Sequence, residues 1–264
     1  MGYEAILYDR HEHVAVLTLN RPERLNAISP GLRDEVHEAV EAAREDDEVR
    51  ALIITGAGRG FCSGVDLTGA RPDPARGPQN ERLDEFGWVG RWAKRFHYFD
   101  KPLIAAVNGV AAGAGMSMAL AADLRVGSPE TRFKTVFVER SLSPDSGLSY
   151  FLPRVIGYSR AADLIMTSRM VDADEAYRLG LIDRLVPADR LVEAAVELAG
   201  QINQWPPLAV RASKRVLQHN ASAEFETALK YETVSLGFAR RAPEDVRESH
   251  LAFTEKRKPR YTGA

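Results

Sequence analysis

Two glycine-containing turns are the parts of this sequence whose residue types and spacing point to chemistry. The first is residues 61–66 (FCSGVD), and the second is residues 109–115 (GVAAGAG), which a small apolar stretch follows. Glycine and alanine carry no reactive group, but they let a ligand approach the main chain closely. A helix that begins at such a turn presents unpaired N–H groups and the positive end of its dipole. The pattern predicts main-chain amides that stabilise an oxygen bearing negative charge.

One carboxylate lies further along the chain in another turn that precedes a predicted helix. Asp145 lies in the turn at residues 143–147 (SPDSG), which leads into a predicted helix. Aspartate is strongly favoured as a helix N-cap, and that is one interpretation of it. The other is a functional acid or base, and the residues alone leave both open.

The composition excludes several classes of protein. The chain has 264 residues, 45% of them hydrophobic and 27% charged, with a net charge of −2. This balance is ordinary for a globular protein and gives no argument for a nucleic-acid or membrane partner. The lone Cys62 excludes an internal disulfide and fits a reducing compartment. Because we find neither a signal-peptide pattern nor an apolar run of about 20 residues, we expect a cytoplasmic protein. The histidines are scattered, so no metal site is predicted.

Strands and helices alternate over the first 190 residues, and only helices follow. Strands are predicted at residues 3–9, 14–19, 49–55, 103–107, 123–127, 132–138 and 182–186. Helices are predicted at 30–45, 81–99, 116–122 and 172–180, after the turn at 143–147, and from 188 to about 256 with breaks at 205–207 and 242–243. The Pro- and Gly-rich stretch at 69–80 is expected to be a surface loop or a flap over a site. This order favours an α/β core with a helical appendage.

Several motifs, in order along the chain, resemble the enoyl-CoA hydratase/isomerase family, also called the crotonase superfamily. They are NRP (20–22), LNA (25–27), LIITG (52–56), FCSGVDL (61–67), KP (101–102), AAVNG (105–109), AD (122–123), LPR (152–154), A…GLI (176–182) and FTEKR (253–257). The resemblance implies a core of repeated ββα units at 1–204, a helical trimerisation region at 205–264, and an acyl-CoA thioester substrate. Coenzyme A is then part of the substrate, and no separate cofactor is expected.

The resemblance also gives the two turns a role. Their oxyanion-hole donors would be the Ser63 and Ala114 N–H groups. Removing a proton next to a thioester places charge on its oxygen as an enolate, which two fixed amides stabilise more than the ground state. Losing one such donor typically costs about 3 kcal/mol of barrier.

The side chains depart from the hydratases of this family, which position a water with two glutamates. The corresponding positions here are Ser117 and Phe137, and neither can act as a carboxylate. Asp145 instead matches the catalytic aspartate of dienoyl-CoA isomerases and of the ring-opening isomerases of phenylacetate breakdown. With Phe137 and Leu142 as candidate apolar walls, its pKa could rise into the working range, and it could shuttle a proton between two carbons without water. Glu139 is a weaker second acid, because strand alternation points it outward.

Substrate contacts also follow from the resemblance, in two groups. Residues expected along the CoA groove and the second turn are Arg24, Leu25, Ala27, Cys62, Asp66, Leu67, Val110 and Gly113. Phe253 and Lys256 match positions that reach the CoA of a neighbouring subunit in a trimer, which the family often pairs into a hexamer. Arg24 has an alternative interpretation as a solvated surface charge.

Four functional hypotheses stay open on the sequence. The first is an acyl-CoA isomerase that uses Asp145, and the second is a hydratase in which Asp145 or Glu139 substitutes for the missing glutamates. The third is a non-catalytic acyl-CoA binder. The fourth is ring closure or opening of a dicarboxylate or cyclic CoA ester.

Overall fold

Two sheets of unequal size form the centre of the protein. The computed structural model describes residues 2–68 and 79–264. The larger sheet has the strand order β1-β2-β3-β5-β7-β9 and the smaller one β4-β6-β8. The strands are β1 (Ile6–His11), β2 (Val14–Leu19), β3 (Ala51–Gly56), β4 (Gly60–Cys62), β5 (Leu103–Val107), β6 (Val110–Ala112), β7 (Leu124–Gly127), β8 (Arg132–Lys134) and β9 (Arg184–Leu185).

Consecutive strands form a repeated unit. Each of the pairs β3/β4, β5/β6 and β7/β8 places its first strand in the larger sheet and its second in the smaller one. Except for the antiparallel hairpin β1–β2, neighbouring strands run parallel. The second strands therefore lie side by side, and so do the turns that follow them. The predicted α/β core of repeated units is confirmed.

Helix α1 (Pro30–Glu45) shows how local signals fix an element. The Ser29 hydroxyl accepts a hydrogen bond from the Leu32 N–H at 3.2 Å, and Pro30 occupies the first helical turn, where its missing N–H costs nothing. The face predicted to be apolar is the buried one and consists of Leu32, Val36, Ala39, Val40 and Ala43. It packs against the β1–β2 hairpin in the main core.

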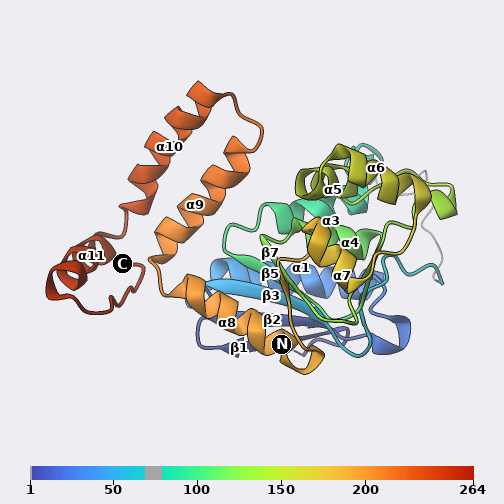
Figure 1. Cartoon of the computed structure of the whole chain (residues 1–264), viewed down its shortest axis with the longest axis horizontal. Helices are drawn as coiled ribbons and strands as arrows, with labels where there is room; N and C mark the ends of the chain where they lie inside the picture. Colours follow the sequence, from blue (N-terminus) through green and yellow to red (C-terminus); the bar gives the residue numbers. More distant parts are fainter. Residues whose placement is uncertain (1, 69–78) are drawn as a thin grey trace.

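Helix α4 (Ala114–Ala121) lies at the centre of the molecule. It follows β5 and β6, and all eight of its residues are buried. A helix whose residues are buried on every side has no solvent face and must be surrounded by other elements. Figure 1 shows it among α3 (Gly87–His97), α5 (Leu148–Ile156) and the sheet.

The structure corrects two predicted elements. The helix predicted at 81–99 is interrupted between α2 (Gln79–Arg82) and α3, where the Asp84 carboxylate accepts from the Phe86 N–H and Gly87 has a φ of 57°. Leu83 and Phe86 are exposed instead of joining the apolar stripe. The strand predicted at 132–138 ends at Lys134, because Val136 takes a left-handed φ of 59°. Most of the predicted loop or flap at 69–80 lies outside the described residues.

The remaining helices complete the chain. They are α6 (Tyr158–Thr167), α7 (Ala173–Leu179), α8 (Leu191–Asn203), α9 (Pro207–Asn220), α10 (Phe225–Ala239) and α11 (Pro243–Glu255). Helix α8 covers one face of the larger sheet, and α9 and α10 form a hairpin that projects from the core (Figure 1). Helix α11 lies beyond that hairpin, at the opposite end of the molecule from α4 and α5.

Ion pairs attach the base of α9 to the core. The Lys214 ammonium contacts the Asp123 carboxylate at 2.7 Å, and Arg211 and Arg215 both contact Asp100. The buried Lys214 also donates to the Lys101 carbonyl at 2.8 Å.

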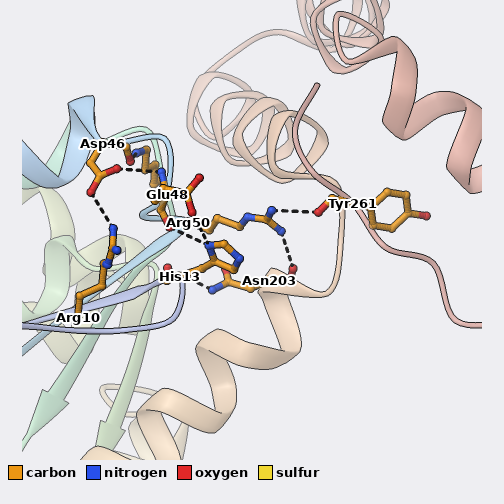
Figure 2. A network of polar contacts seen from close by, with 8 residues as sticks. Arg10, His13, Asp46, Glu48, Arg50, Asn203 and Tyr261 are labelled. Atoms are coloured by element: carbon orange, nitrogen blue, oxygen red, sulfur yellow. Dashed lines mark hydrogen bonds and ion pairs between the residues drawn. The ribbon is translucent and has the colours of Figure 1, made fainter.

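A second polar network connects the core with the C-terminal segment (Figure 2). The Arg50 guanidinium donates to the Tyr261 carbonyl at 2.9 Å and to the Asn203 carbonyl at 3.5 Å. On its other side the His13 imidazole contacts the Glu48 carbonyl at 2.9 Å. The C-terminal segment is thus bonded to Arg50, the residue that precedes β3.

Asn26 holds the turn before α1 against the loop between β3 and β4. Its side chain is fully buried, donates to the carbonyls of Ala57 and Gly60, and accepts from the Arg21 N–H. Its φ of 57° is left-handed, a conformation that asparagine tolerates better than most residues.

We predict that Asn26→Ala destabilises the protein by about 3 kcal/mol, because three hydrogen bonds of a buried side chain, at about 1 kcal/mol each, are lost. Urea denaturation measures the change in the free energy of unfolding. Asn20→Ala is the matched control, since the Asn20 side chain makes no hydrogen bond within the described ranges. Equal stabilities of the two variants would contradict this role of Asn26.

Candidate active site

The two glycine-containing turns predicted from the sequence lie next to each other. Strands β4 and β6 run parallel with Cys62 opposite Ala111, so both turns begin at the same edge of the smaller sheet. A Cβ atom added to Gly115 would lie 2.1 Å from the Cys62 carbonyl oxygen, and one added to Gly64 would lie 3.7 Å from the Ala114 nitrogen. Only glycine allows this approach of one backbone to the other.

The two predicted oxyanion donors differ in their present hydrogen bonding. Ala114 is the first residue of α4, and its N–H has no acceptor among the residues that the structure describes. The Ser63 N–H donates to the Leu25 carbonyl at 3.0 Å. One donor is therefore free at a helix N-terminus, and the other is engaged by the neighbouring turn. That both reach a single oxygen stays a prediction.

The turn that contains Arg24 and Leu25 packs directly against Ser63. The Ser63 hydroxyl donates to the Arg24 carbonyl at 3.3 Å, next to the bond from its N–H to Leu25. Leu25 has a left-handed φ of 50°, and Ala27 is buried beside it. The Arg24 side chain is exposed. The structure thus brings the predicted CoA residues of this turn to the edge of the first glycine turn.

The segment from Phe137 to Gly147 passes over the start of α4. A Cβ atom on Gly113 would lie 3.9 Å from the buried Phe137 ring. The Leu142 N–H donates to the Phe137 carbonyl at 3.0 Å, and the Leu142 side chain is exposed. One turn into α4, the Ser117 hydroxyl donates to the Ser146 carbonyl. These contacts bring the Asp145 turn to the same end of α4 as Gly113.

Asp145 does not cap a helix. Helix α5 begins at Leu148 with Gly147 as its N-cap, and no side chain caps it. The Asp145 carboxylate is half-buried and accepts a hydrogen bond from the Ser146 hydroxyl at 2.9 Å. Burial raises the pKa of this carboxyl above its ordinary value, and the Ser146 hydrogen bond opposes that rise. Of the two interpretations that the sequence left open, the helix cap is wrong.

Glu139 has a different environment from Asp145. It lies in a short 3-10 turn (Val138–Arg140) instead of the predicted strand, and its exposed carboxylate contacts the Lys134 ammonium at 2.7 Å. The hydrogen bond from Lys134 holds the pKa of Glu139 below its usual range. An exposed, ion-paired carboxylate of this kind is a poor general base.

Asp66, predicted to line the CoA groove, is bonded to neighbouring protein groups. Its carboxylate accepts from the Thr68 hydroxyl and N–H and contacts the Arg21 guanidinium at 3.0 Å. The hydrogen bonds from Thr68, with Arg21, lower the pKa of Asp66 to about 2.

Other predicted contact residues fall into a core group and an exposed group. Cys62 is fully buried, and burial raises the pKa of its thiol to about 12, so it is no nucleophile. Val110 is partly buried on β6, whereas Leu67 is exposed next to Asp66. Phe253 is 87% exposed at the end of α11, far from α4 in the same chain (Figure 1). Lys256 caps that helix with a φ of 54°.

Sequence reasoning missed the parts played by Asn26, Ser117 and Ser146. Ser117 was interpreted as the place of an absent glutamate, although it is the single polar residue of an otherwise apolar helix. A lone serine in an apolar helix could have indicated a hydrogen bond to another segment, because a buried hydroxyl needs a partner. Within the described ranges, no three metal-binding side chains cluster. No helix there is long and apolar enough to cross a membrane.

Comparison with known proteins decides the family. The sequence model of the enoyl-CoA hydratase/isomerase family matches residues 9–264. The chain belongs to this family. The chain is 34% identical over 260 residues to the 1,2-epoxyphenylacetyl-CoA isomerase of Escherichia coli, covering 98% of this chain and 99% of that protein. It is also 34% identical to the crotonyl-CoA hydratase of Syntrophomonas wolfei, covering 99% of both chains.

Solved structures support the same assignment. Subunit I of an enoyl-CoA hydratase from Geobacillus kaustophilus superposes with a TM-score of 0.90 and 34% identity over 99% of both chains. The fold is therefore that of the crotonase superfamily, and the protein is an enzyme of the enoyl-CoA hydratase/isomerase family. Because relatives of equal identity are named as an isomerase and as a hydratase, the overall similarity does not choose between the two reactions.

We predict that Asp145→Asn raises the melting temperature at pH 7. Burial raises the folded-state pKa of Asp145 above the unfolded value of about 3.9, so the ionised carboxylate weakens the folded state at neutral pH. Stability is lost as the pH rises through the folded-state pKa, and the gain from Asp145→Asn must therefore vanish near pH 3. Scanning calorimetry at both pH values tests this, with the exposed Asp9→Asn as control. A lower melting temperature for Asp145→Asn at pH 7 would refute it.

Proposed function

We propose that this family member isomerises an acyl-CoA thioester by moving a double bond, with Asp145 as the acid–base group. The observation that carries the proposal is the state of the Asp145 carboxylate. It is half-buried, caps no helix, lies at the turn beside the first part of α4, and has a raised pKa. A carboxylate of this kind is suited to accept a proton from carbon and return it.

The amides of the two glycine turns would stabilise the intermediate. A thioester oxygen at the N-terminus of α4 would accept from the free Ala114 N–H. For the Ser63 N–H to contribute, the Leu25 carbonyl must share or release the hydrogen bond that it now accepts. Proton loss at the α carbon then gives an enolate, and Asp145 delivers the proton to the γ carbon. The proposed reaction needs no cofactor beyond the coenzyme A of the substrate.

Hydration is the second candidate, and the name of the Syntrophomonas wolfei relative motivates it. The residues at the two glutamate positions argue against it. Ser117 is buried and its hydroxyl is bonded to the Ser146 carbonyl, while Phe137 is a buried hydrocarbon ring. Neither can hold and deprotonate a water, and Glu139 is ion-paired at the surface. The name of the Escherichia coli relative, an isomerase, supports isomerisation.

We also propose that residues 205–264 form a trimerisation region in which α11 brings Phe253 and Lys256 to the CoA of a neighbouring subunit. The tail exposes more apolar side chains than an isolated chain would keep in water. Those that are more than two-fifths exposed are Trp205, Leu217, Phe225, Leu229, Val234, Leu236, Leu251 and Phe253. Exposed apolar side chains in such numbers are typical of subunit interfaces. The Lys256 ammonium would suit a phosphate as a point charge.

The isomerase proposal predicts that Asp145→Asn lowers kcat about 10²- to 10⁴-fold on a 3-enoyl-, dienoyl- or epoxyphenylacetyl-CoA substrate, as expected when a general base is lost. Glu139→Gln is the matched control and should retain nearly full activity. Crotonyl-CoA, followed by loss of enoyl absorbance, measures hydration in the same preparations. Unchanged isomerisation in Asp145→Asn would refute the assignment, and crotonyl-CoA turnover that exceeds every isomerisation rate would favour hydration. No turnover of any thioester, with measurable binding, would identify a CoA-ester binder.

The assembly proposal predicts a sedimentation-equilibrium mass of three or six times 29.2 kDa. The double variant Leu229→Lys/Leu236→Lys places two charges on the exposed apolar surface of α10 and should shift the mass to that of one chain. Leu7→Lys, at a comparably exposed position on β1, should leave the assembly intact. A monomeric wild-type protein would rule the proposal out.

A further inference from the structure

The one polar side chain of α4 makes a hydrogen bond outside its own helix. Ser117 is 1% exposed, and its neighbours along α4 are glycine, alanine, methionine and leucine. A buried serine in a helix commonly donates to the carbonyl four residues earlier. Ser117 instead donates to the Ser146 carbonyl, 29 residues further along the chain. This bond connects the centre of the molecule to the turn that carries Asp145.

The turn on the other side of that bond has a backbone that needs support. Ser146 is buried and has a φ of 53°, and Gly147 follows with a φ of 84°. Two consecutive left-handed residues, the first with a side chain, cost on the order of 1 kcal/mol or more and persist only where the surroundings hold them. The Ser117 hydroxyl meets the carbonyl of this strained residue, and the Ser146 hydroxyl donates to the Asp145 carboxylate at 2.9 Å.

The chemistry of the donor explains why a serine suits this position. A carbonyl oxygen accepts hydrogen bonds and donates none, so its partner must supply a hydrogen. An ionised glutamate at position 117 has no hydrogen to donate and would face the Ser146 carbonyl with negative charge. The residue that the family resemblance expects here is therefore incompatible with the Asp145 turn as it is folded. Ser117 and this turn form one unit.

We infer that Ser117 is a positioning residue, whose hydroxyl fixes the left-handed turn at Ser146 and thereby aims the Asp145 carboxylate at the substrate. The expected effect on turnover rests on the proposed function of Asp145. The expected effect on the structure of the turn does not. A carboxylate displaced by about 1 Å loses on the order of 10²-fold in rate, so the bond from Ser117 has a measurable effect on turnover. Substrate affinity depends on other residues and should change little.

The structural consequence can be measured without any substrate. The Leu148 N–H donates to the Asp145 carbonyl at 2.9 Å, so its hydrogen exchange reports whether the turn stays closed. Exchange at Leu148 should become at least about tenfold faster in Ser117→Ala than in the wild-type protein. Ser128→Ala is the matched control, because the Ser128 hydroxyl is equally buried but has no partner within the described residues. Unchanged exchange at Leu148 in Ser117→Ala would overturn the inference, whatever Asp145 does.

The kinetic consequence is tested with a double-mutant cycle on the isomerisation substrate. Ser117→Ala alone should lower kcat about 10- to 100-fold with KM within about twofold of wild type. In the Asp145→Asn background the same substitution should cost less than twofold, because the group that it positions is already gone. Equal losses in both backgrounds would show that Ser117 supports the fold generally, which also overturns the inference. If Asp145→Asn alone retains activity, the proposed function fails, and the exchange result still decides the positioning claim.

Discussion

The site depends on two backbone segments, the turns after β4 and β6, which approach each other more closely than side chains would allow. The Cys62 carbonyl lies where a Cβ atom of Gly115 would be, and the Ala112 carbonyl lies 2.9 Å from the Cβ position of Gly64. These contacts let β4 and β6 pair in parallel and bring their two turns together. The start of α4 is consequently buried, which keeps its free Ala114 N–H away from solvent and strengthens its interaction with charge.

The polar groups around α4 are the basis of the reaction that we propose. The helix has one hydroxyl and no carboxylate, and that hydroxyl is bonded to the backbone of the Asp145 turn. The Ser117 hydroxyl at this end of the helix therefore supports the turn of a single acid, Asp145. Activation of a water by the hydratase arrangement would need two carboxylates. Proton transfer between carbons requires a single carboxylate and benefits from the absence of water, whereas hydration requires a water that something must hold.

Local signals in the sequence predicted much of the fold and the position of the site. Helix α1 was placed correctly because Ser29 and Pro30 mark its start and an apolar face follows at helical spacing. The two turns were recognised because glycine spacing is itself a local pattern. Asp145 was identified, but its environment was not, because the sequence cannot show that Gly147 ends the turn with no side-chain cap.

The features that sequence reasoning missed are set by contacts between distant residues or by backbone strain. The bond between the Ser63 N–H and the Leu25 carbonyl joins segments 38 residues apart, and the bond from Ser117 to Ser146 joins segments 29 residues apart. The break between α2 and α3 follows from the positive φ of Gly87, which an apolar stripe does not reveal. Glu139 was assigned to a strand that ends early at Lys134.

In the proposed reaction Asp145 takes a proton from the α carbon of a thioester, and no water is added. Deuterium uptake tests this most directly, by incubating a 3-enoyl-CoA ester with the enzyme in D2O and locating the label by mass spectrometry and NMR. We predict C–D bonds at the α or γ carbon of the recovered ester with the wild-type protein, and none with Asp145→Asn. Equal uptake with both proteins, or a product that carries added water at the β carbon, would show that Asp145 does not have this role.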